Sequence, residues 1–193
     1  SLFLCLLFFV AGCASDEAKK QSFITDAKIY IEKQEYNEAI IQLKNVLKID
    51  PKSIEANKLL MQSHAKLGNI RELFLTCQRL EQIEPENLDI KLDVASGYLL
   101  AKQLPDAVTR VEHVLSKMPD NKKALYIYAA ILVEENAPLE KIADVYLRIL
   151  KNNPDESKAH MVLSSILLGQ KNYVAAEKHL KSVIRLNPEN MKA

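Results

Sequence analysis

The sequence predicts an all-α solenoid of about five stacked helix–turn–helix units. Five prolines, Pro51, Pro85, Pro119, Pro154 and Pro188, recur at intervals of 34, 34, 35 and 34 residues. Apolar residues recur at fixed distances before each proline, and their spacing along the chain is helical. A period of this length is typical of repeat proteins, in which each unit packs only on its neighbours.

The composition favours helices and argues against several functional classes. Apolar residues make up 48% of the chain, whereas it has only 4 Gly, 7 Pro and no Trp, which disfavours an all-β design with many tight turns. The net charge is +1, from 26 basic and 25 acidic residues without a polybasic stripe. We therefore expect no nucleic-acid partner.

Residues 1–12 are predicted to be a signal peptide without its basic start. The run from Leu2 to Gly12 is apolar and uncharged over 11 residues, which is short of the roughly 18 needed to span a bilayer. It ends in Val10-Ala11-Gly12-Cys13, which resembles the bacterial lipobox. The resemblance implies that Cys13 is lipidated and becomes the mature N-terminus, with residues 13–19 as the lipidated end and a short linker. An ordinary signal peptide or a buried N-terminal helix are the alternatives.

The residue after this cysteine bears on the cellular location. The residue after Cys13 is Ala14, not the Asp that resembles an inner-membrane retention signal in Gram-negative lipoproteins. By this resemblance we expect an outer-membrane anchor facing the periplasm. The chain begins with Ser1, and we interpret its N-terminus as clipped. Cys77 would be the one cysteine left besides Cys13, so no intrachain disulfide is expected, and its place on an apolar helix face predicts a small buried side chain.

The apolar positions of the units superpose when they are counted back from each proline. Twelve residues before the prolines lie Ala39, Leu73, Ala107, Ile142 and Ala176; eight before lie Leu43, Cys77, Val111, Tyr146 and Leu180; five before lie Val46, Leu80, Val114, Ile149 and Val183. In the first helices one slot holds Ala27, Met61, Ala95, Ala129 and Ser164, and a second holds Tyr30, His64, Tyr98, Leu132 and Leu167. The units are assigned to residues 20–53, 54–87, 88–121, 122–156 and 157–190, and residues 191–193 are read as the start of a truncated further unit.

These slots resemble the tetratricopeptide repeat (TPR) family over residues 20–190. The segments EYNEAIIQLKNVLKIDP at 35–51 and NYVAAEKHLKSVIRLNP at 172–188 carry the resemblance most plainly. It implies antiparallel helix pairs stacked into a right-handed superhelix. The chain departs from the family pattern because the usual Trp and Leu-Gly pair are missing, and Leu73 and Ile142 replace the usual Ala.

The turns are also predicted from the register. The slots stay in step through Leu132 and slip by one at Ile142, which places the extra residue of the fourth unit at 134–138. Ser53, Asn87 and Asn121 each follow a proline by two residues and are expected helix N-caps. Gly97 lies inside a helix, where close approach of a neighbouring helix or a ligand is one explanation and sequence drift another.

No catalytic pattern is found, so we expect no enzyme activity, metal or cofactor. The four histidines, His64, His113, His160 and His179, fit neither HExxH nor a Cys/His ligand spacing. A phosphate-binding glycine loop and a GxSxG nucleophile motif are likewise absent from the sequence.

The TPR register instead implies a groove for a protein or peptide partner on the inner face, lined by the first helices. Its predicted lining residues are Lys58, Gln62, Leu92, Ser96, Leu99, Tyr126, Val133, Met161 and Leu168. A carboxylate clamp is disfavoured, because Lys58 with Gln62 is the nearest approach to one. The groove turns apolar from Leu92 onward, which suits an apolar extended segment or an amphipathic helix. Packing of these residues against adjacent helices is the alternative.

The sequence thus predicts a bacterial TPR lipoprotein that serves as a scaffold in the cell envelope. Lipidated TPR proteins of this kind act in pilus assembly, outer-membrane protein assembly and exopolysaccharide export. The segment AIIQLKNVLKIDP at 39–51 looks most like the exosortase-associated TPR lipoproteins. Two alternatives stay open: the TPR region of a larger envelope enzyme whose catalytic domain follows residue 193, and a cytoplasmic TPR adaptor.

Overall fold

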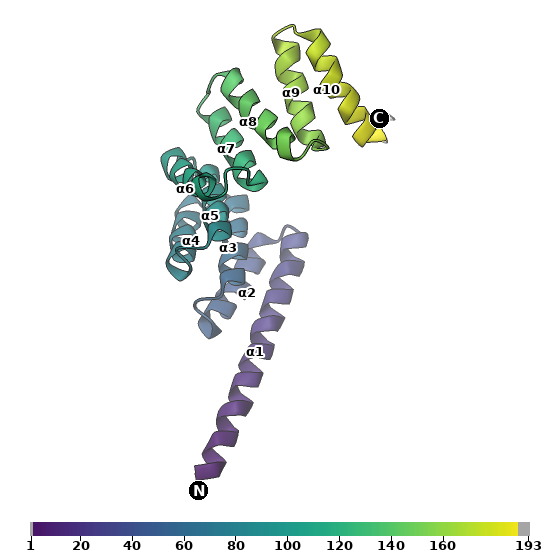
Figure 1. Ribbon diagram of the computed structural model, residues 1–193. Coiled ribbons are helices and arrows are strands. Elements are labelled where there is room, and N and C mark those ends of the chain that lie inside the picture. The colour runs from purple at the N-terminus through teal and green to yellow at the C-terminus, as the bar shows by residue number, and fades with distance from the viewer. Residues whose placement is uncertain (1, 189–193) are drawn as a thin grey trace. The chain divides into compact units, whose positions relative to one another are not determined.

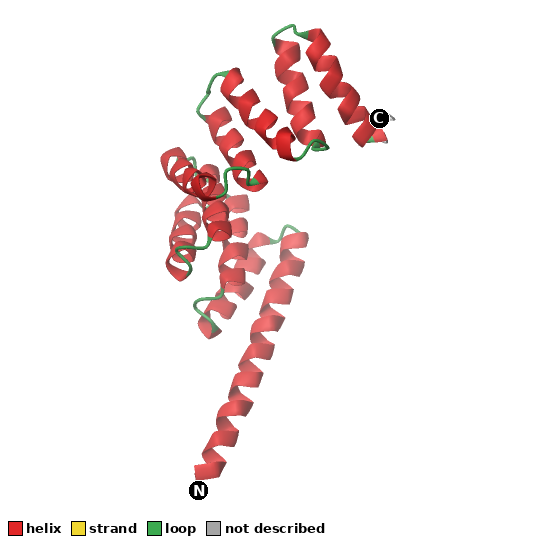
Figure 2. Cartoon of the chain, viewed as in Figure 1, coloured by secondary structure: helices red, strands yellow, loops and turns green. Residues whose placement is uncertain are grey.

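The computed structural model describes the backbone of residues 2–188 and the side chains of residues 15–188. Within this part every regular element is a helix, ten in all, joined by short turns (Figure 2). The all-α prediction is therefore confirmed. Residues 191–193, predicted to begin a further unit, lie outside the described part.

The helices belong to two compact bodies, divided after Lys102. The N-terminal body holds α1 (Leu2–Glu32), α2 (Tyr36–Ile49), α3 (Ile54–Leu67), α4 (Ile70–Ile83) and α5 (Leu88–Leu100). The C-terminal body holds α6 (Leu104–Lys117), α7 (Lys122–Glu134), α8 (Leu139–Asn152), α9 (Ser157–Gly169) and α10 (Tyr173–Leu186). Within each body, sequential helices run antiparallel and pack side by side (Figure 1).

Four-residue turns join one predicted unit to the next, at 50–53, 84–87, 118–121 and 153–156. Each turn has a repeat proline as its second residue, where the fixed φ of proline stops the preceding helix. The helices that follow begin at Ile54, Leu88, Lys122 and Ser157, which are the first residues of the units defined from the sequence.

The three predicted N-caps are present at the starts of α3, α5 and α7. The Ser53 hydroxyl accepts a hydrogen bond from the amide of Ala56, and the Asn87 side chain accepts from the amides of Asp89 and Ile90. The Asn121 side chain accepts from the amide of Ala124 at 2.9 Å. Each satisfies donors that the first helical turn leaves without a partner.

The turns inside the units are shorter, with two or three residues, except in the fourth unit. There α7 ends at Glu134 and α8 begins at Leu139, which leaves the four residues 135–138. The extra residue of the fourth unit thus lies where the register predicted it.

The apolar stripe of the second helices forms the core of each body. Its slots are buried in all five units, apart from Leu180, which is half-buried. Cys77 is fully buried, as expected for a small apolar side chain in this stripe.

Gly97 in α5 lies against α3 and α4. A Cβ added there would be 2.5 Å from the Cys77 sulfur and 3.1 Å from the Met61 sulfur. Close approach of neighbouring helices therefore explains this mid-helix glycine, because any larger residue would collide with buried side chains.

Helix α1 is continuous from Leu2 to Glu32, so that residues 13–19, predicted as a linker, belong to it. Cys13 precedes the residues whose side chains are described. Among the described residues no helix is both long and apolar enough to cross a membrane.

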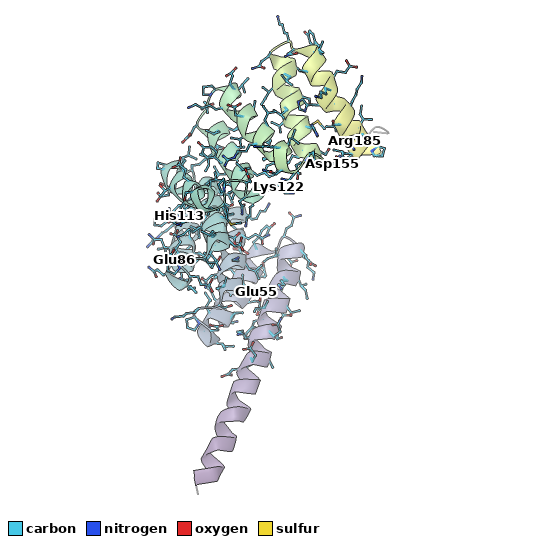
Figure 3. The ribbon with its side chains drawn as sticks, viewed as in Figure 1. Glu55, Glu86, His113, Lys122, Asp155 and Arg185 are labelled. Carbon is cyan, nitrogen blue, oxygen red and sulfur yellow. The ribbon has the colours of Figure 1, made fainter. Side chains whose placement is uncertain are left out.

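A polar contact between the rings of His160 and His179 joins the last helix pair, α9 and α10. His160 Nδ1 lies 2.8 Å from His179 Nδ1, and His160 Nε2 lies 2.9 Å from the Pro154 carbonyl oxygen. Because a carbonyl only accepts, His160 Nε2 donates the proton of that bond. Asp155 and Arg185 form an ion pair of 2.8 Å nearby (Figure 3).

Candidate functional site

The predicted groove residues fall on both bodies. Lys58 and Gln62 lie on α3 and Leu92, Ser96 and Leu99 on α5, all in the N-terminal body. Tyr126 and Val133 on α7 and Met161 and Leu168 on α9 belong to the C-terminal body. We therefore describe two inner faces, one for each body, and a groove continuous across them stays a prediction.

The N-terminal inner face contains an apolar cleft between α3 and α5, which we call the inner cleft. Its volume is about 260 Å³, and it is lined by Met61, Gln62, Ala65, Lys66, Ser96, Gly97 and Leu100. Small residues at Ala65, Ser96 and Gly97 leave the space open, while Leu100 is 59% exposed at its mouth. The cleft is thus sized for one apolar side chain of a ligand.

The structure brings two of the predicted residues, Gln62 and Ser96, to this cleft. The Ser96 hydroxyl donates to the carbonyl of Leu92 at 3.0 Å, one turn earlier in α5, and this bond holds its side chain against the helix. Gln62 is exposed and lies at the polar edge. Met61, Lys66 and Leu100 also line the cleft and were not predicted to do so; the unusual glycine at 97 was the signal that marked the place.

Leu92 does not line the groove, contrary to the prediction. Its side chain is fully buried. Leu92 lies one turn before Ala95, which occupies the slot where neighbouring helices pack tightly. Ala95 and Tyr98 are buried on the same side of α5 as Leu92. Leu99 is half-buried and contributes only part of its surface.

Lys58 is occupied by an ion pair with α5. Its Nζ lies 2.6 Å from the Asp93 carboxylate, and both side chains are partly buried. A second cross-helix pair joins Lys28 of α1 to Glu55 of α3 at 2.7 Å, where Glu55 is marked in Figure 3. Because Asp93 already neutralises Lys58, Lys58 is not the free cation that a carboxylate clamp needs.

The C-terminal inner face is more apolar at its surface. Val133, Met161 and Leu168 are 55%, 45% and 44% exposed. Exposed side chains of this size are available to contact a partner.

Tyr126 packs into the C-terminal body instead of projecting from it. Its ring meets Tyr146 edge-on at 6.0 Å between centroids, and the Lys158 ammonium lies 5.0 Å from its centre. Burial, together with the neighbouring Glu156 carboxylate, raises the pKa of the Tyr126 phenol, so the phenol is neutral. Its hydroxyl is enclosed and has no hydrogen-bond partner of normal geometry among the described residues.

Glu156 itself is tied to the preceding helix pair by Lys122. The two side chains lie 2.8 Å apart, and the hydrogen bond from Lys122 lowers the pKa of the Glu156 carboxyl despite its partial burial. Within the described part of the chain, no group of three or more His, Cys, Asp or Glu is placed to hold a metal ion.

Comparison with known families and structures agrees with this architecture. The tetratricopeptide repeat family matches residues 27–53 and 157–190. The structure of Pseudomonas aeruginosa PilF aligns with a TM-score of 0.73 at 13% identity, over 89% of this chain and 78% of that one. The described helices form a TPR solenoid. This fold is also similar to MamA from Desulfovibrio magneticus RS-1, with a TM-score of 0.68 at 18% identity over 88% of this chain and 96% of that one.

A third TPR structure, that of YrrB, has a peptide-binding site described as unusual. It aligns with a TM-score of 0.58 at 15% identity, over 88% of this chain and 87% of YrrB. At these identities the three structures establish the fold of this chain and nothing more.

Two curated relatives match part of the chain by sequence. Human aspartyl/asparaginyl beta-hydroxylase is 38% identical over 76 residues, which is 39% of this chain and 10% of that protein. The Caenorhabditis elegans protein O-mannosyl-transferase F38B6.6 is 31% identical over 61 residues, 32% of this chain and 9% of that protein. The TPR chain therefore spans about a tenth of the length of these relatives.

Proposed function

We propose that this TPR protein is a membrane-anchored scaffold in the periplasm that binds an apolar segment of a partner protein. The inner cleft between α3 and α5 carries the proposal, since it offers an apolar recess of about 260 Å³ on the face where TPR helices are free of their own chain. The partner would belong to envelope assembly or export, in an exopolysaccharide, pilus or outer-membrane protein system.

The chemistry of the cleft indicates what kind of segment it binds. Its floor is formed by Met61, Ala65 and Gly97, while Gln62 and Lys66 supply polar groups at the edge. Such a site takes a Leu- or Met-sized side chain and leaves hydrogen-bonding groups for the backbone beside it. The peptide-binding site of YrrB, a protein of the same fold, supports this assignment.

The membrane anchor in this proposal is a lipid on Cys13. It is supported by the resemblance of Val10-Ala11-Gly12-Cys13 to the lipobox and by the apolar run before it. Several acyl chains on one residue hold a protein stably on a bilayer, whereas one chain gives marginal binding.

Binding of peptides to the chain tests the scaffold role. Peptides selected from a random library on the wild-type chain should share an apolar residue at a fixed position, and Ala65→Leu, which fills the cleft, should weaken their binding at least about tenfold. Ala18→Leu is the matched control, because Ala18 is exposed on α1 away from the cleft. Equal binding by wild type and Ala65→Leu would show that the partner binds elsewhere.

The curated relatives favour one second candidate, the TPR region of a larger enzyme. Both matched proteins are named as enzymes, and the match covers about a tenth of each. Sequencing the gene beyond the codon for Ala193 separates the candidates, since a catalytic domain there would replace the scaffold proposal and further 34-residue units would support it.

A further inference from the structure

A second cavity lies on the opposite side of α3 from the inner cleft, and we call it the outer pocket. Its volume is about 350 Å³, and it lies between α2 and α4 with α3 beneath. The polar side chains around it are Lys44, Lys48, His64, Glu72, Thr76 and Arg79. Since successive residues of a helix are turned by about 100°, His64 faces this pocket while Met61 and Ala65 face the inner cleft.

The outer pocket is cationic. Lys44, Lys48 and Arg79 contribute three positive charges, and Glu72 contributes one negative charge. Lys44 and Lys48 are one turn apart on α2 and both line the pocket, and the Lys48 ammonium also donates to the Asn45 side-chain oxygen at 3.0 Å. Three cations converging on one cavity repel each other, and a bound anion would relieve this repulsion.

Arg79 is held in place at the edge of the pocket. Its Nη1 donates to the Asn57 side-chain oxygen at 3.2 Å, and Asn57 is fully buried. The Asn57 amide in turn donates to the Ser53 carbonyl at 2.8 Å. A guanidinium has five N–H donors in a rigid plane, so fixing one of them orients the others.

His64 forms part of the base of the outer pocket and is 5% exposed. Its Nδ1 is buried without a hydrogen-bond partner among the described residues. Burial lowers the pKa of His64, and Lys44 lowers it further while Glu72 opposes, so the ring is neutral and one nitrogen can donate. The same slot of the other units holds Tyr or Leu, which makes this polar ring particular to the second unit.

We propose that the outer pocket binds a small dianion, a phosphomonoester or a dicarboxylate, through Lys44, Lys48 and Arg79. The net charge of the polar lining, three cations against one carboxylate, matches two negative charges. Leu47 and Leu60 supply apolar walls for the carbon part of the ligand. The volume is at the small end of the range of ligand sites, which is roughly 300–1,000 Å³.

Titration of the full chain with inorganic phosphate and with succinate tests the site. At least one of them should bind saturably in the millimolar range or tighter, and should shift the ring NMR signals of His64 but not those of His113. Saturation by phosphate alone identifies a phosphomonoester site, and saturation by succinate alone identifies a dicarboxylate site. Acetate at matched ionic strength should bind more weakly than either.

Charge-matched variants complete the test. Lys44→Gln with Lys48→Gln should weaken the saturable binding at least about tenfold, because charge-assisted bonds are lost. Lys141→Gln with Lys151→Gln removes two exposed lysines of α8 and should leave affinity within about twofold. The proposal is overturned if neither dianion saturates, if His64 does not shift, or if the two double variants lose affinity equally.

Discussion

At the scale of single residues, the Cys77 sulfur explains why position 97 holds a glycine, because it leaves no space for a Cβ. Gly97→Ala would raise the helix propensity of α5 by about 1 kcal/mol, but the added Cβ would lie 2.5 Å from that sulfur. We expect the collision to dominate and the free energy of unfolding to fall by about 1–3 kcal/mol, measured by urea denaturation.

Two further variants separate the collision from a backbone effect. Cys77→Ala removes the sulfur, so Gly97→Ala should cost much less stability in that background, a clear departure from additivity. Gly169→Ala meets no atom within 4 Å and should change the free energy of unfolding by less than about 0.5 kcal/mol. Additive effects of Gly97→Ala and Cys77→Ala would contradict the steric explanation.

His64 is expected to lower the stability of the second unit. Its Nδ1 is buried without a partner in the described part of the chain, which costs free energy that an apolar side chain does not. His64→Leu installs the residue of the same slot in the last two units, and should raise the free energy of unfolding by about 1 kcal/mol. His113→Leu, at a half-buried histidine of α6, is the control and should change it by less than about 0.5 kcal/mol.

The pH dependence of the same variant gives an independent check. Burial lowers the pKa of His64 in the folded state, so the unfolded chain takes up the proton first as the pH falls. Wild-type stability from this group is therefore lost as the pH drops through about 6.5, the ordinary histidine value, toward the lower folded value. The advantage of His64→Leu should grow between neutral and mildly acidic pH, and a constant or shrinking advantage would contradict this explanation.

The sequence predicted these residues in part. The register placed Gly97 inside a helix and His64 in a packing slot, and both placements hold. It did not predict that His64 Nδ1 has no hydrogen-bond partner among the described residues, because the atoms around Nδ1 come from helices whose distances the register does not give. The prediction that Leu92 lines the groove was wrong for a related reason, since a periodic slot does not show how closely the next helix covers a residue.

At the scale of elements, each hairpin turn within a unit contains one residue in the left-handed region. These are Gln34, Gly68, Lys102, Asn136 and Lys171, with φ between 53° and 69°. Only the second unit uses glycine, for which this conformation carries no Cβ penalty. The other units therefore hold some backbone strain in their turns.

This strain predicts a stabilising change in the last hairpin. Lys171→Gly should raise the free energy of unfolding by about 0.5–1 kcal/mol, because φ at this position is +58°. Lys171→Ala keeps the Cβ and removes the charge, so it should give no such gain, whereas Gly68→Ala should lose about 1 kcal/mol. Equal effects of Lys171→Gly and Lys171→Ala in urea denaturation would mean that the charge, not the backbone, decides.

The caps and turn lengths were the elements best predicted from sequence. Ser53, Asn87 and Asn121 act locally, within three residues of the amides they bind, and such contacts depend little on the rest of the fold. The continuation of α1 through residues 13–19 was not predicted, although these residues carry no helix-breaking Pro and only Gly12 precedes them. A polar segment after an apolar run was interpreted as a linker, although its Ala and Lys residues favour helix.

At the scale of the whole molecule, a TPR array combines short-range packing with long surfaces. Each body is stabilised by contacts between helices that neighbour one another in sequence, as in α1 with α2 or α9 with α10. The two sides of α3 then become available for separate tasks, an apolar cleft on one side and a cationic pocket on the other. The scaffold that we propose can use both at once, because the two sites lie on different sides of α3.

The tether itself is tested by labelling cells that express the complete gene with an alkyne analogue of palmitate. The wild type should be labelled and should sediment with membranes, because acyl chains on Cys13 would anchor it. Cys13→Ser should lose both the label and the membrane fraction. Cys77→Ala is the control, since Cys77 is fully buried and should not accept a lipid. An unlabelled wild type, or a labelled Cys13→Ser, would contradict the lipoprotein assignment and favour the cytoplasmic adaptor, whereas loss confined to Cys13→Ser would place the TPR scaffold on the envelope.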